Sequence, residues 1–280
     1  MPELPEVETV RQTLRRVLKG KKIVRAEVRE DAIMMFGVPP EVIQTGLEGR
    51  TVTEVGRKGK YWWLEFADQP WLYGHLGMSG WVREIGQDSI RLREHGRAPW
   101  EDENGRPRFL KLELEVEGGG KVAFTDGRRL GRLWLSSNPK DDPRMEKLGP
   151  DALDELPTGK NLHAILSKRK APIKALLLDQ KLFAGVGNWI ADEALYQARI
   201  SPKRLGESLS LKDVTRLRDT IHMIIQKAVD LGADKEKFPE DWLFHHRWGG
   251  DKGVDSIDGK KIVREPVGGR TTAWVPKVQK

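Results

Sequence analysis

The chain opens with MPELPEVE (residues 1–8), and this stretch has the composition of a helix start. Pro5 and Glu6 are typical of a first helical turn, where proline fits the backbone and an acid faces the positive end of the helix dipole. The apolar residues that follow recur at helical spacing: Val7, Val10, Leu14, Val17 and Leu18. We therefore expect an amphipathic helix at the head of the fold.

The same stretch also holds a candidate nucleophile. Removal of Met1, which a small second residue normally permits, leaves the secondary amine of Pro2 at the terminus. A free α-amine has a pKa of about 7.7–8.0, so much of it is unprotonated near neutral pH. Such an amine can attack an aldehyde-like carbon and form an iminium ion, with the carboxyl group of Glu3 beside it. The two interpretations are compatible, because a buried helix would hold the amine in one place.

Composition favours a folded protein with an anionic partner. The 280 residues suffice for two domains or one large one, and 38% of them are hydrophobic. The net charge of +7 and the pI of 9.4 favour an anionic partner, such as nucleic acid. Residues 252–280 carry seven Lys or Arg against three acids. Charge alone leaves a solvated basic tail as the alternative.

Several classes of protein are excluded by the residues that the chain lacks. It has no cysteine, so disulfides and thiolate zinc sites are excluded, and its six histidines show no metal-ligand spacing. We expect no metal and no cofactor. The amino terminus has no secretory pattern, and no apolar stretch approaches the roughly 20 residues that span a membrane. We expect an intracellular protein with no membrane partner, in the cytoplasm and nucleoid of a bacterium or the nucleus of a eukaryote.

Residues 1–135 are predicted to form an antiparallel β-sandwich or barrel behind the first helix. Short, β-rich, partly alternating runs separated by turns are typical of such domains. A glycine-rich hairpin turn is expected at 118–120, and the charged segment Gln87–Arg108 is expected to be a mobile loop. The predicted strands are Lys22–Arg29, Thr51–Val55, Lys60–Phe66, Trp71–His75, Trp81–Glu84, Phe109–Val116, Lys121–Thr125 and Arg132–Leu135.

After a linker at 136–150, the pattern changes to helices over 151–250 and to a β-hairpin over 251–280. Helices are expected at Asn161–Lys168, Ile173–Asp179 and Asn188–Arg199, and a long helix begins at Ser210 with a capping-box signal. Short strands are expected at Val254–Ile257, Lys261–Glu265 and Thr271–Val275. The turns between them, Asp258-Gly259 and Gly268-Gly269, are typical of hairpins. The fold class is therefore α+β.

Two glycine-containing turns are candidates for DNA contact. In Gly185-Val186-Gly187-Asn188, Asn188 can cap a helix while the first amides face a phosphate. The paired Arg128 and Arg129 can meet phosphates or base edges, while Met78 and Leu130 could wedge into a base stack. The alternatives are ordinary: a helix cap, a solvated turn and a core methionine. None of these motifs decides the function by itself.

Together, the motifs resemble those of the formamidopyrimidine-DNA glycosylase and endonuclease VIII family across the full chain. Several independent blocks occur in one order with suitable spacing, which makes the resemblance specific. In order, they are MPELPEVE at 1–8, Lys60, HLGMSG at 75–80, Asp126-x-Arg128-Arg129, LGPDAL at 148–153, IKxLLLD at 173–179 and GVGN at 185–188.

The resemblance implies a base-excision enzyme that flips oxidised bases out of duplex DNA and cuts the strand. It assigns Pro2 as the nucleophile on the sugar carbon that bears the base. Glu3 would be the acid/base group with Glu6 in support, and Lys60 would assist β,δ-elimination. The implied DNA contacts are Met78, Arg128, Arg129, Leu130, Arg169, Lys170, Lys174 and Asn188. It also implies a helix–two-turn–helix around Asn188, damaged double-stranded DNA as the partner, and a monomer.

Departures from the family pattern concern the tail and the substrate. Most bacterial members end in a four-cysteine zinc finger, whereas this tail is similar to the zincless finger of plant and fungal members. There a β-hairpin presents an arginine to the lesion, the position of Arg270 here. Stability of this finger is then expected from strand pairing and from Ile262, Val263 and Trp274.

The second departure is a short connection after the long helix. Only about ten residues separate Gly232 from Trp242, where bacterial formamidopyrimidine enzymes place a longer loop over an extruded 8-oxoguanine. We therefore expect activity on formamidopyrimidines, hydantoins and abasic sites, and weaker activity on 8-oxoguanine. Leu130 stands where bacterial members usually have Phe, which makes the wedge smaller.

Two other functions compete with this one. A lyase that cuts abasic sites but removes few bases is the alternative among enzymes. A damage-reading DNA-binding protein with an inactive site is the alternative from another class. The presence of Pro2, Glu3, Lys60 and Arg270 together argues against the binder, which has no need of that set.

Overall fold

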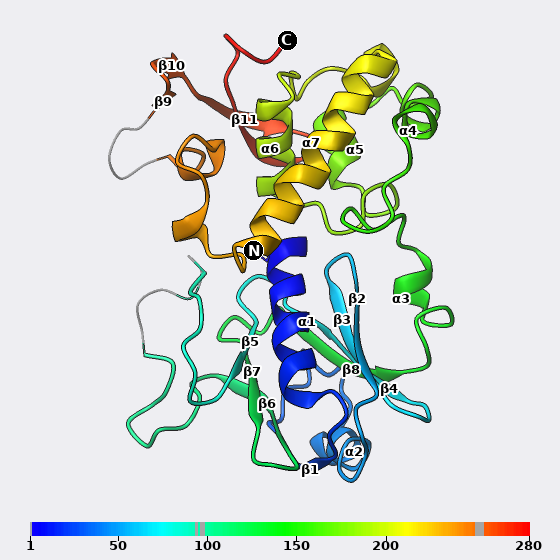
Figure 1. Cartoon of the computed structure of the whole chain (residues 1–280), viewed down its shortest axis with the longest axis vertical. Coiled ribbons are helices and arrows are strands. Elements are labelled where there is room, and N and C mark those ends of the chain that lie inside the picture. Colours follow the sequence, from blue (N-terminus) through cyan, green and yellow to red (C-terminus); the bar gives the residue numbers. More distant parts are fainter. Residues whose placement is uncertain (1, 93–94, 96–98, 250–254) are drawn as a thin grey trace. The chain divides into compact units, whose positions relative to one another are not determined.

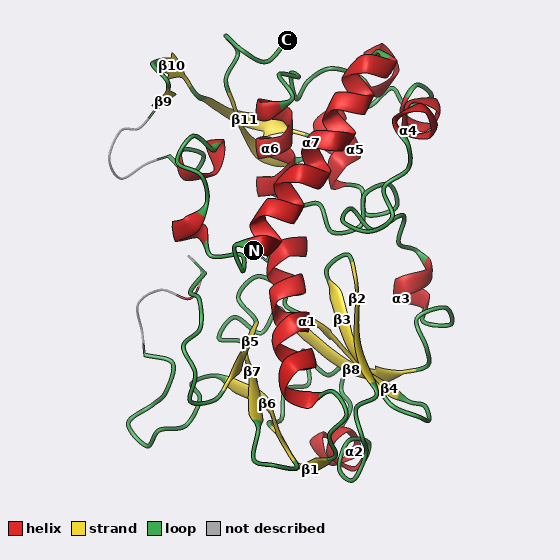
Figure 2. Ribbon diagram, in the orientation of Figure 1, coloured by secondary structure: helices red, strands yellow, loops and turns green. Residues whose placement is uncertain are grey.

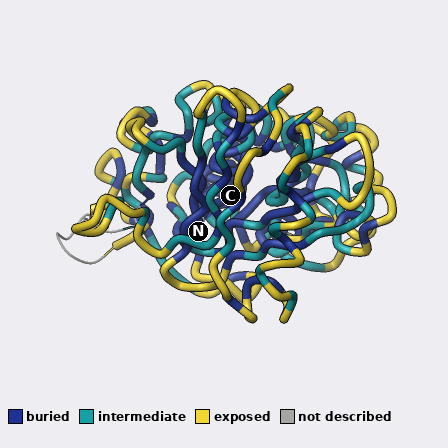
Figure 3. Tube along the Cα trace, turned by 90° about the horizontal axis from the view of Figure 1, so that it is seen from below, coloured by how far each residue is buried: buried dark blue, intermediate teal, exposed yellow. Residues whose placement is uncertain are grey.

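A computed structural model describes residues 2–92, 95, 99–249 and 255–280 (Figure 1). The chain divides into two compact units, Met1–Lys147 and Leu148–Lys280. The first unit is mainly strands and the second mainly helices (Figure 2). Buried segments alternate with exposed turns along the trace (Figure 3). This is the α+β class predicted from the sequence.

The first unit is an antiparallel β-sandwich with a leading helix. Helix α1 spans Leu4–Leu18. One sheet has the order β1-β6-β7-β5 and the other the order β2-β3-β4-β8, and every pair is antiparallel. The strands are β1 (Ile23–Val28), β2 (Glu54–Lys58), β3 (Tyr61–Glu65), β4 (Trp71–His75), β5 (Trp81–Glu84), β6 (Leu110–Val116), β7 (Lys121–Thr125) and β8 (Arg132–Ser136).

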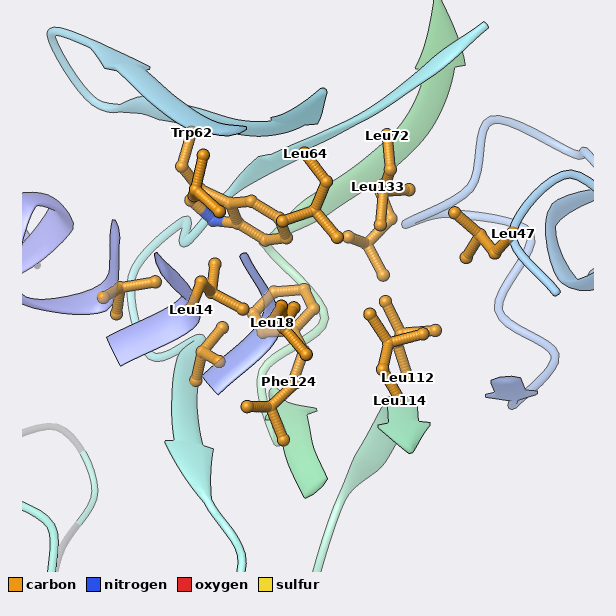
Figure 4. Packing of buried hydrophobic residues seen from close by; sticks show 14 of the residues in the cluster. Leu14, Leu18, Leu47, Trp62, Leu64, Leu72, Leu112, Leu114, Phe124 and Leu133 are labelled. Atoms are coloured by element: carbon orange, nitrogen blue, oxygen red, sulfur yellow. The ribbon is translucent and has the colours of Figure 1, made fainter. Parts of the chain in front are cut away.

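The sandwich core lies between the two sheets and is closed by α1. Trp62, Leu64 and Leu72 come from one sheet and face Leu112 and Phe124 of the other (Figure 4). All five side chains are almost fully buried. Burial of large apolar side chains is worth about 1.5–3 kcal/mol each. This packing fixes the amino-terminal helix to the sheets.

Two local elements differ from the sequence prediction. The strand expected at Thr51–Val55 begins later, at Glu54, because Val52 exchanges backbone hydrogen bonds with Gly20 and Lys21. Two short helices, α2 (Pro40–Thr45) and α3 (Pro143–Glu146), were not predicted. Helix α3 lies within the expected linker. Of the expected loop 87–108, residues 93–94 and 96–98 lie outside the described residues.

The second unit contains four α-helices in its described part: α4 (Gly159–Leu166), α5 (Ile173–Leu178), α6 (Asn188–Gln197) and α7 (Leu211–Asp230). The predicted capping box at the start of α7 is confirmed, since Ser210 and Asp213 bond reciprocally. A short 3-10 turn, η2 (Gly206–Ser208), precedes α7, and two more, η3 (Lys235–Lys237) and η4 (Leu243–His245), follow it.

The carboxyl-terminal segment forms two small hairpins. Strands β9 (Ser256–Ile257) and β10 (Lys260–Lys261) pair around Asp258-Gly259, and β11 (Val263–Val267) and β12 (Arg270–Trp274) pair around Gly268-Gly269. All four turn residues have positive φ, as type I′ hairpin turns require. Val254, expected in the first strand, lies outside the described residues.

Candidate active site and nucleic-acid interface

The head of α1 buries the predicted nucleophile and both carboxyl groups. Pro2 is buried, and Glu3 and Glu6 are only 2% and 6% exposed. Glu3 is the N-cap residue, and its backbone N–H donates to the Glu6 carboxylate at 3.0 Å. The helix-start and nucleophile interpretations therefore use the same residues. The cap therefore holds both carboxyl groups at the start of the helix, directly after Pro2.

The environment of Glu6 changes its protonation. Burial, together with the neighbouring Glu3 carboxylate, raises the pKa of Glu6 from 4.5 to about 7. Two carboxyl groups in one buried site cannot both ionise easily. The carboxyl of Glu6 therefore keeps its proton to higher pH than an exposed glutamate does, a property that suits a group that exchanges protons with a reacting centre.

Lys60 occupies a tight turn that is fixed to α1. Strand β2 ends at Lys58, Gly59 has φ +58, and Tyr61 pairs with Lys58 across the turn. The side chain of the neighbouring Arg57 is buried, and its Nε donates to Glu8 of α1 at 2.9 Å. This ion pair joins the helix that carries Pro2 to the hairpin that carries Lys60.

His75, which no sequence-based prediction assigned a role, lies in β4 and pairs with Tyr61, the residue after Lys60. Its ring centroid is 4.9 Å from that of Tyr61. Burial lowers the pKa of His75 to about 4, with the charges of Lys60 and Arg132 acting in the same direction. Its Nδ1 accepts a hydrogen bond from the Gly77 N–H at 3.0 Å, so the neutral ring carries its proton on Nε2. His75 therefore provides a neutral donor next to a lysine.

The two loops that hold the predicted wedge residues are bonded to each other. Ser79 donates its hydroxyl proton to Asp126 at 2.7 Å, and Asp126 also accepts the N–H groups of Leu130 and Gly131. A Cβ on Gly77 would lie 2.3 Å from the Leu130 carbonyl carbon, so only glycine fits there. The loop around Met78 therefore rests on the backbone of Leu130.

The side chains on this joined surface differ in their environment. Arg128 is exposed, Leu130 is 41% exposed and Met78 is half-buried. Arg129 is instead held by the buried Asp31, whose carboxylate accepts from its Nε at 2.8 Å. Arg128 and Leu130 are thus available to a ligand, whereas Arg129 has a binding partner within the unit.

In the second unit, side-chain hydrogen bonds hold the turn before α6, and Asn188 is not the N-cap residue that was expected. Gly187 is the N-cap residue, and Asn188 is the first helical residue. Its Nδ2 donates to the Thr271 carbonyl of β12 at 3.0 Å, and its buried Oδ1 has no hydrogen-bond partner among the described residues. Gln180 bonds the turn through Gly185 and Val186. Asn188 therefore links α6 to the hairpin.

Lys174 does not lie at the surface, where direct phosphate contact would require it. It is 0% exposed, and its Nζ donates to Asp192 and to the Asn188 carbonyl. Asp192 also accepts from Arg247 at 2.7 Å. Helical periodicity gave no sign of this buried charge cluster, because its members come from distant parts of the sequence.

Arg270 is presented by the β11–β12 hairpin, close to α5. It is exposed and directly follows the Gly268-Gly269 turn. A Cβ on Gly268 would lie 2.8 Å from the Cα of Ala175, so the tip of the hairpin contacts α5. Arg169 and Lys170 are exposed just before α5. These positions give the second unit a basic surface.

The finger expected to lack zinc has an apolar core. Ile262 is buried with Tyr196, Leu243, Ile257, Ala273 and Val275. Val263 and Trp274, expected in the same role, are only half-buried, and the Trp274 Nε1 donates to Glu265 at 2.8 Å. No group of three or more potential metal ligands occurs among the described residues. None of the described helices has the length and apolar character to cross a membrane.

Comparison with known proteins places both units in one family. Residues 1–133 match the formamidopyrimidine-DNA glycosylase N-terminal domain, and residues 148–240 match the formamidopyrimidine-DNA glycosylase H2TH domain. A formamidopyrimidine-DNA glycosylase of Arabidopsis thaliana is 40% identical over 283 residues, covering 100% of this chain and 71% of the relative. One from Geobacter metallireducens is 33% identical and is covered completely, as is this chain.

Solved structures agree. The Lactococcus lactis formamidopyrimidine-DNA glycosylase bound to DNA with an abasic site is 29% identical, with a TM-score of 0.79 over 99% of each chain. Its complex with DNA containing FAPY-dG gives the same TM-score at 28% identity, over 99% of this chain and 100% of that one. A sandwich headed by a buried Pro-Glu pair, followed by the helical unit, defines a DNA glycosylase of base excision repair. The chain belongs to the formamidopyrimidine-DNA glycosylase family.

Proposed function

We propose that this protein is a bifunctional glycosylase and abasic-site lyase that acts on oxidised bases in double-stranded DNA. The observation that carries the proposal is the buried Pro2–Glu3 pair at the head of α1, with Glu6 titrating near neutral pH. A nucleophile and a proton carrier are the minimum that a Schiff-base mechanism needs.

In this mechanism, the Pro2 nitrogen bonds to the sugar carbon that bears the base as the glycosidic bond breaks. The base leaves with a proton, and Glu3 assists opening of the sugar ring, with Glu6 relaying protons. The resulting iminium ion makes the neighbouring sugar protons acidic, and β- and then δ-elimination release the two phosphates. Lys60 assists the eliminations, and the neutral His75 beside it can donate to a phosphate oxygen.

DNA contact is assigned to exposed basic side chains and to the wedge surface. Arg128, Leu130 and Met78 would fill the gap left by the flipped nucleotide. Arg169, Lys170 and Arg270 would meet phosphates from the second unit, and Asn188 would do so through the second N–H of its Nδ2 and the adjacent backbone amides. We assign Lys174 and Arg129 supporting roles, since buried carboxylates hold both.

Borohydride reduction tests the covalent chemistry. Incubation with duplex DNA containing a formamidopyrimidine should give a stable protein–DNA adduct, and Pro2→Gly should abolish it. Pro5→Ala is the matched control, because it changes the first helical turn without touching the terminal amine. If no lesion gives an adduct, the protein is a damage-binding protein and the enzymatic proposal fails. An adduct with abasic sites only would favour the lyase alternative.

We further propose that formamidopyrimidines, hydantoins and abasic sites are preferred to 8-oxoguanine. The support is the short connection after α7, which is packed rather than extended. Phe238 is 4% exposed, and its ring lies 5.7 Å from that of Trp189 and 5.2 Å from that of Trp242. A segment anchored in this way has little length to cover an extruded purine. Equal single-turnover excision rates for 8-oxoguanine and a formamidopyrimidine would contradict the proposal.

A further inference from the structure

Phe109 is an exposed aromatic side chain held in an unfavourable backbone conformation. Its side chain is 59% exposed and its φ is +58. Bulky residues rarely adopt the left-handed region, and when they do the surroundings enforce it, often at functional sites. Here the Asp126 N–H donates to the Phe109 carbonyl at 3.0 Å. The conformation leaves more than half of this apolar side chain exposed to solvent.

The ring lies against the same turn that carries the wedge residues. A Cβ on Gly127 would be 3.2 Å from the Phe109 ring, so this turn and the ring are in contact. Arg128 is the next residue after Gly127. The Leu130 N–H donates to the carboxylate of Asp126, the residue before Gly127. Two exposed apolar side chains, Phe109 and Leu130, therefore flank the exposed Arg128.

The surroundings of Phe109 are cationic. The Arg108 guanidinium lies 5.6 Å from the centre of the ring. Phe109 and Arg128 also line a cavity of about 90 Å³ with Arg91, Arg108 and Trp100, and no carboxylate is among its described lining residues. An aromatic face bordered by three arginines matches a nucleobase with its phosphates, because bases stack on aromatic rings while arginines neutralise the backbone.

We propose that Phe109 stacks on a nucleobase of the damaged duplex, next to the gap that Arg128 and Leu130 enter. This inference rests on the proposed function and deepens it. The aliphatic Leu130 has no π face, so Phe109 supplies the aromatic surface at this point. Phe109 is then a DNA-contacting residue that favours a base left without its partner.

The test uses the full-length protein and a duplex with a tetrahydrofuran abasic analogue opposite 2-aminopurine. Phe109→Gly removes the ring and relieves the positive φ, so the unfolding temperature should not fall. Its Kd for this duplex should rise about tenfold, which corresponds to about 1.4 kcal/mol, and the 2-aminopurine fluorescence change on binding should shrink. Phe109→Tyr should restore both values, and Phe109→Leu should not.

Val42→Ala is the matched control, since Val42 is a similarly exposed apolar residue on α2, at 52%. It should leave the Kd and the fluorescence change as they are. A Phe109→Gly protein that binds like the wild type, or full rescue by Phe109→Leu, would overturn the stacking role. Borohydride trapping of the wild type separates this outcome from failure of the proposed function, because trapping can succeed while Phe109 proves irrelevant to binding.

Discussion

Asp31 and Arg129, 98 positions apart in the chain, form a two-point ion pair, with Nε–Oδ2 at 2.8 Å and Nη2–Oδ1 at 3.1 Å. The Asp31 carboxylate also accepts from Lys111 at 2.9 Å, and its side chain is 1% exposed. Arg129 has a φ of +57 in the turn that carries Arg128 and Leu130. The pair therefore helps to hold the wedge turn in an otherwise unfavourable conformation.

Asp31→Asn should destabilise the protein by about 1–3 kcal/mol at neutral pH, because it weakens charge-assisted hydrogen bonds to two cations. These cations lower the pKa of Asp31 below its usual 3.8, despite burial. A lowered carboxyl pKa contributes stability above the unfolded value and loses it as pH falls. Urea unfolding should therefore show the wild-type advantage shrinking below pH 3.8. An advantage independent of pH would show that packing, not charge, explains the effect.

Glu6 should give the opposite pH dependence. Its pKa is raised to about 7, so between pH 4.5 and 7 the folded protein keeps a proton that the unfolded chain has released. Raising the pH through this window should lower the free energy of unfolding by about 1.4 kcal/mol per pH unit from this group. Glu6→Gln should remove that slope, and Glu41→Gln, at an exposed site on α2, should retain it. An unchanged slope in Glu6→Gln would assign the titration elsewhere.

Local patterns predicted the fold well because the sequence signals of strands and helices extend over only a few residues. The alternation in β6 and the capping box at Ser210 needed only neighbours in sequence. Thr51 and Val52 looked equally β-like, but their partners, residues 20–22, were not identifiable from the pattern. Helix α2 has a single buried residue, Ile43, so it leaves almost no periodic signal.

The candidate site also has a part that local sequence motifs predicted and a part that they did not. The order of motifs indicated Pro2, Glu3 and Lys60, but no motif revealed which cations are held by acids. Asp31 and Asp192 belong to no recognisable sequence motif, yet they form ion pairs with Arg129 and Lys174, respectively. The protonation of His75 and Glu6 depends on burial that only three-dimensional packing creates. The sequence therefore predicts the residue types at the site better than their charge states.

Lys170 lies just before α5 and Lys174 lies in its first turn. Replacing them with alanine should nevertheless have different effects on stability and DNA binding. Removing a buried cation leaves Asp192 partly uncompensated, so Lys174→Ala should cost about 3–5 kcal/mol of stability. Lys170→Ala, at an exposed site, should leave stability within about 0.5 kcal/mol. For DNA binding, Lys170→Ala should reduce the slope of log K against log salt by about 1 if the side chain meets one phosphate. If the Lys174→Ala protein has normal stability and a reduced slope of log K against log salt, Lys174 contacts a phosphate directly and the supporting role is wrong.

The finger should keep its structure and activity through apolar packing, independent of metal. Ile262 is 2% exposed within the cluster that includes Leu243 and Val275. Truncating a buried isoleucine typically costs about 2–5 kcal/mol of stability, so Ile262→Ala should unfold the hairpin. It should therefore weaken strand cutting, as the single variant Arg270→Ala should. Prolonged treatment with a chelator should change neither the unfolding temperature nor the rate of strand cutting, because no thiolate ligand exists in the chain. Loss of activity on chelation, with recovery on adding zinc, would show that oxygen and nitrogen ligands hold a metal after all.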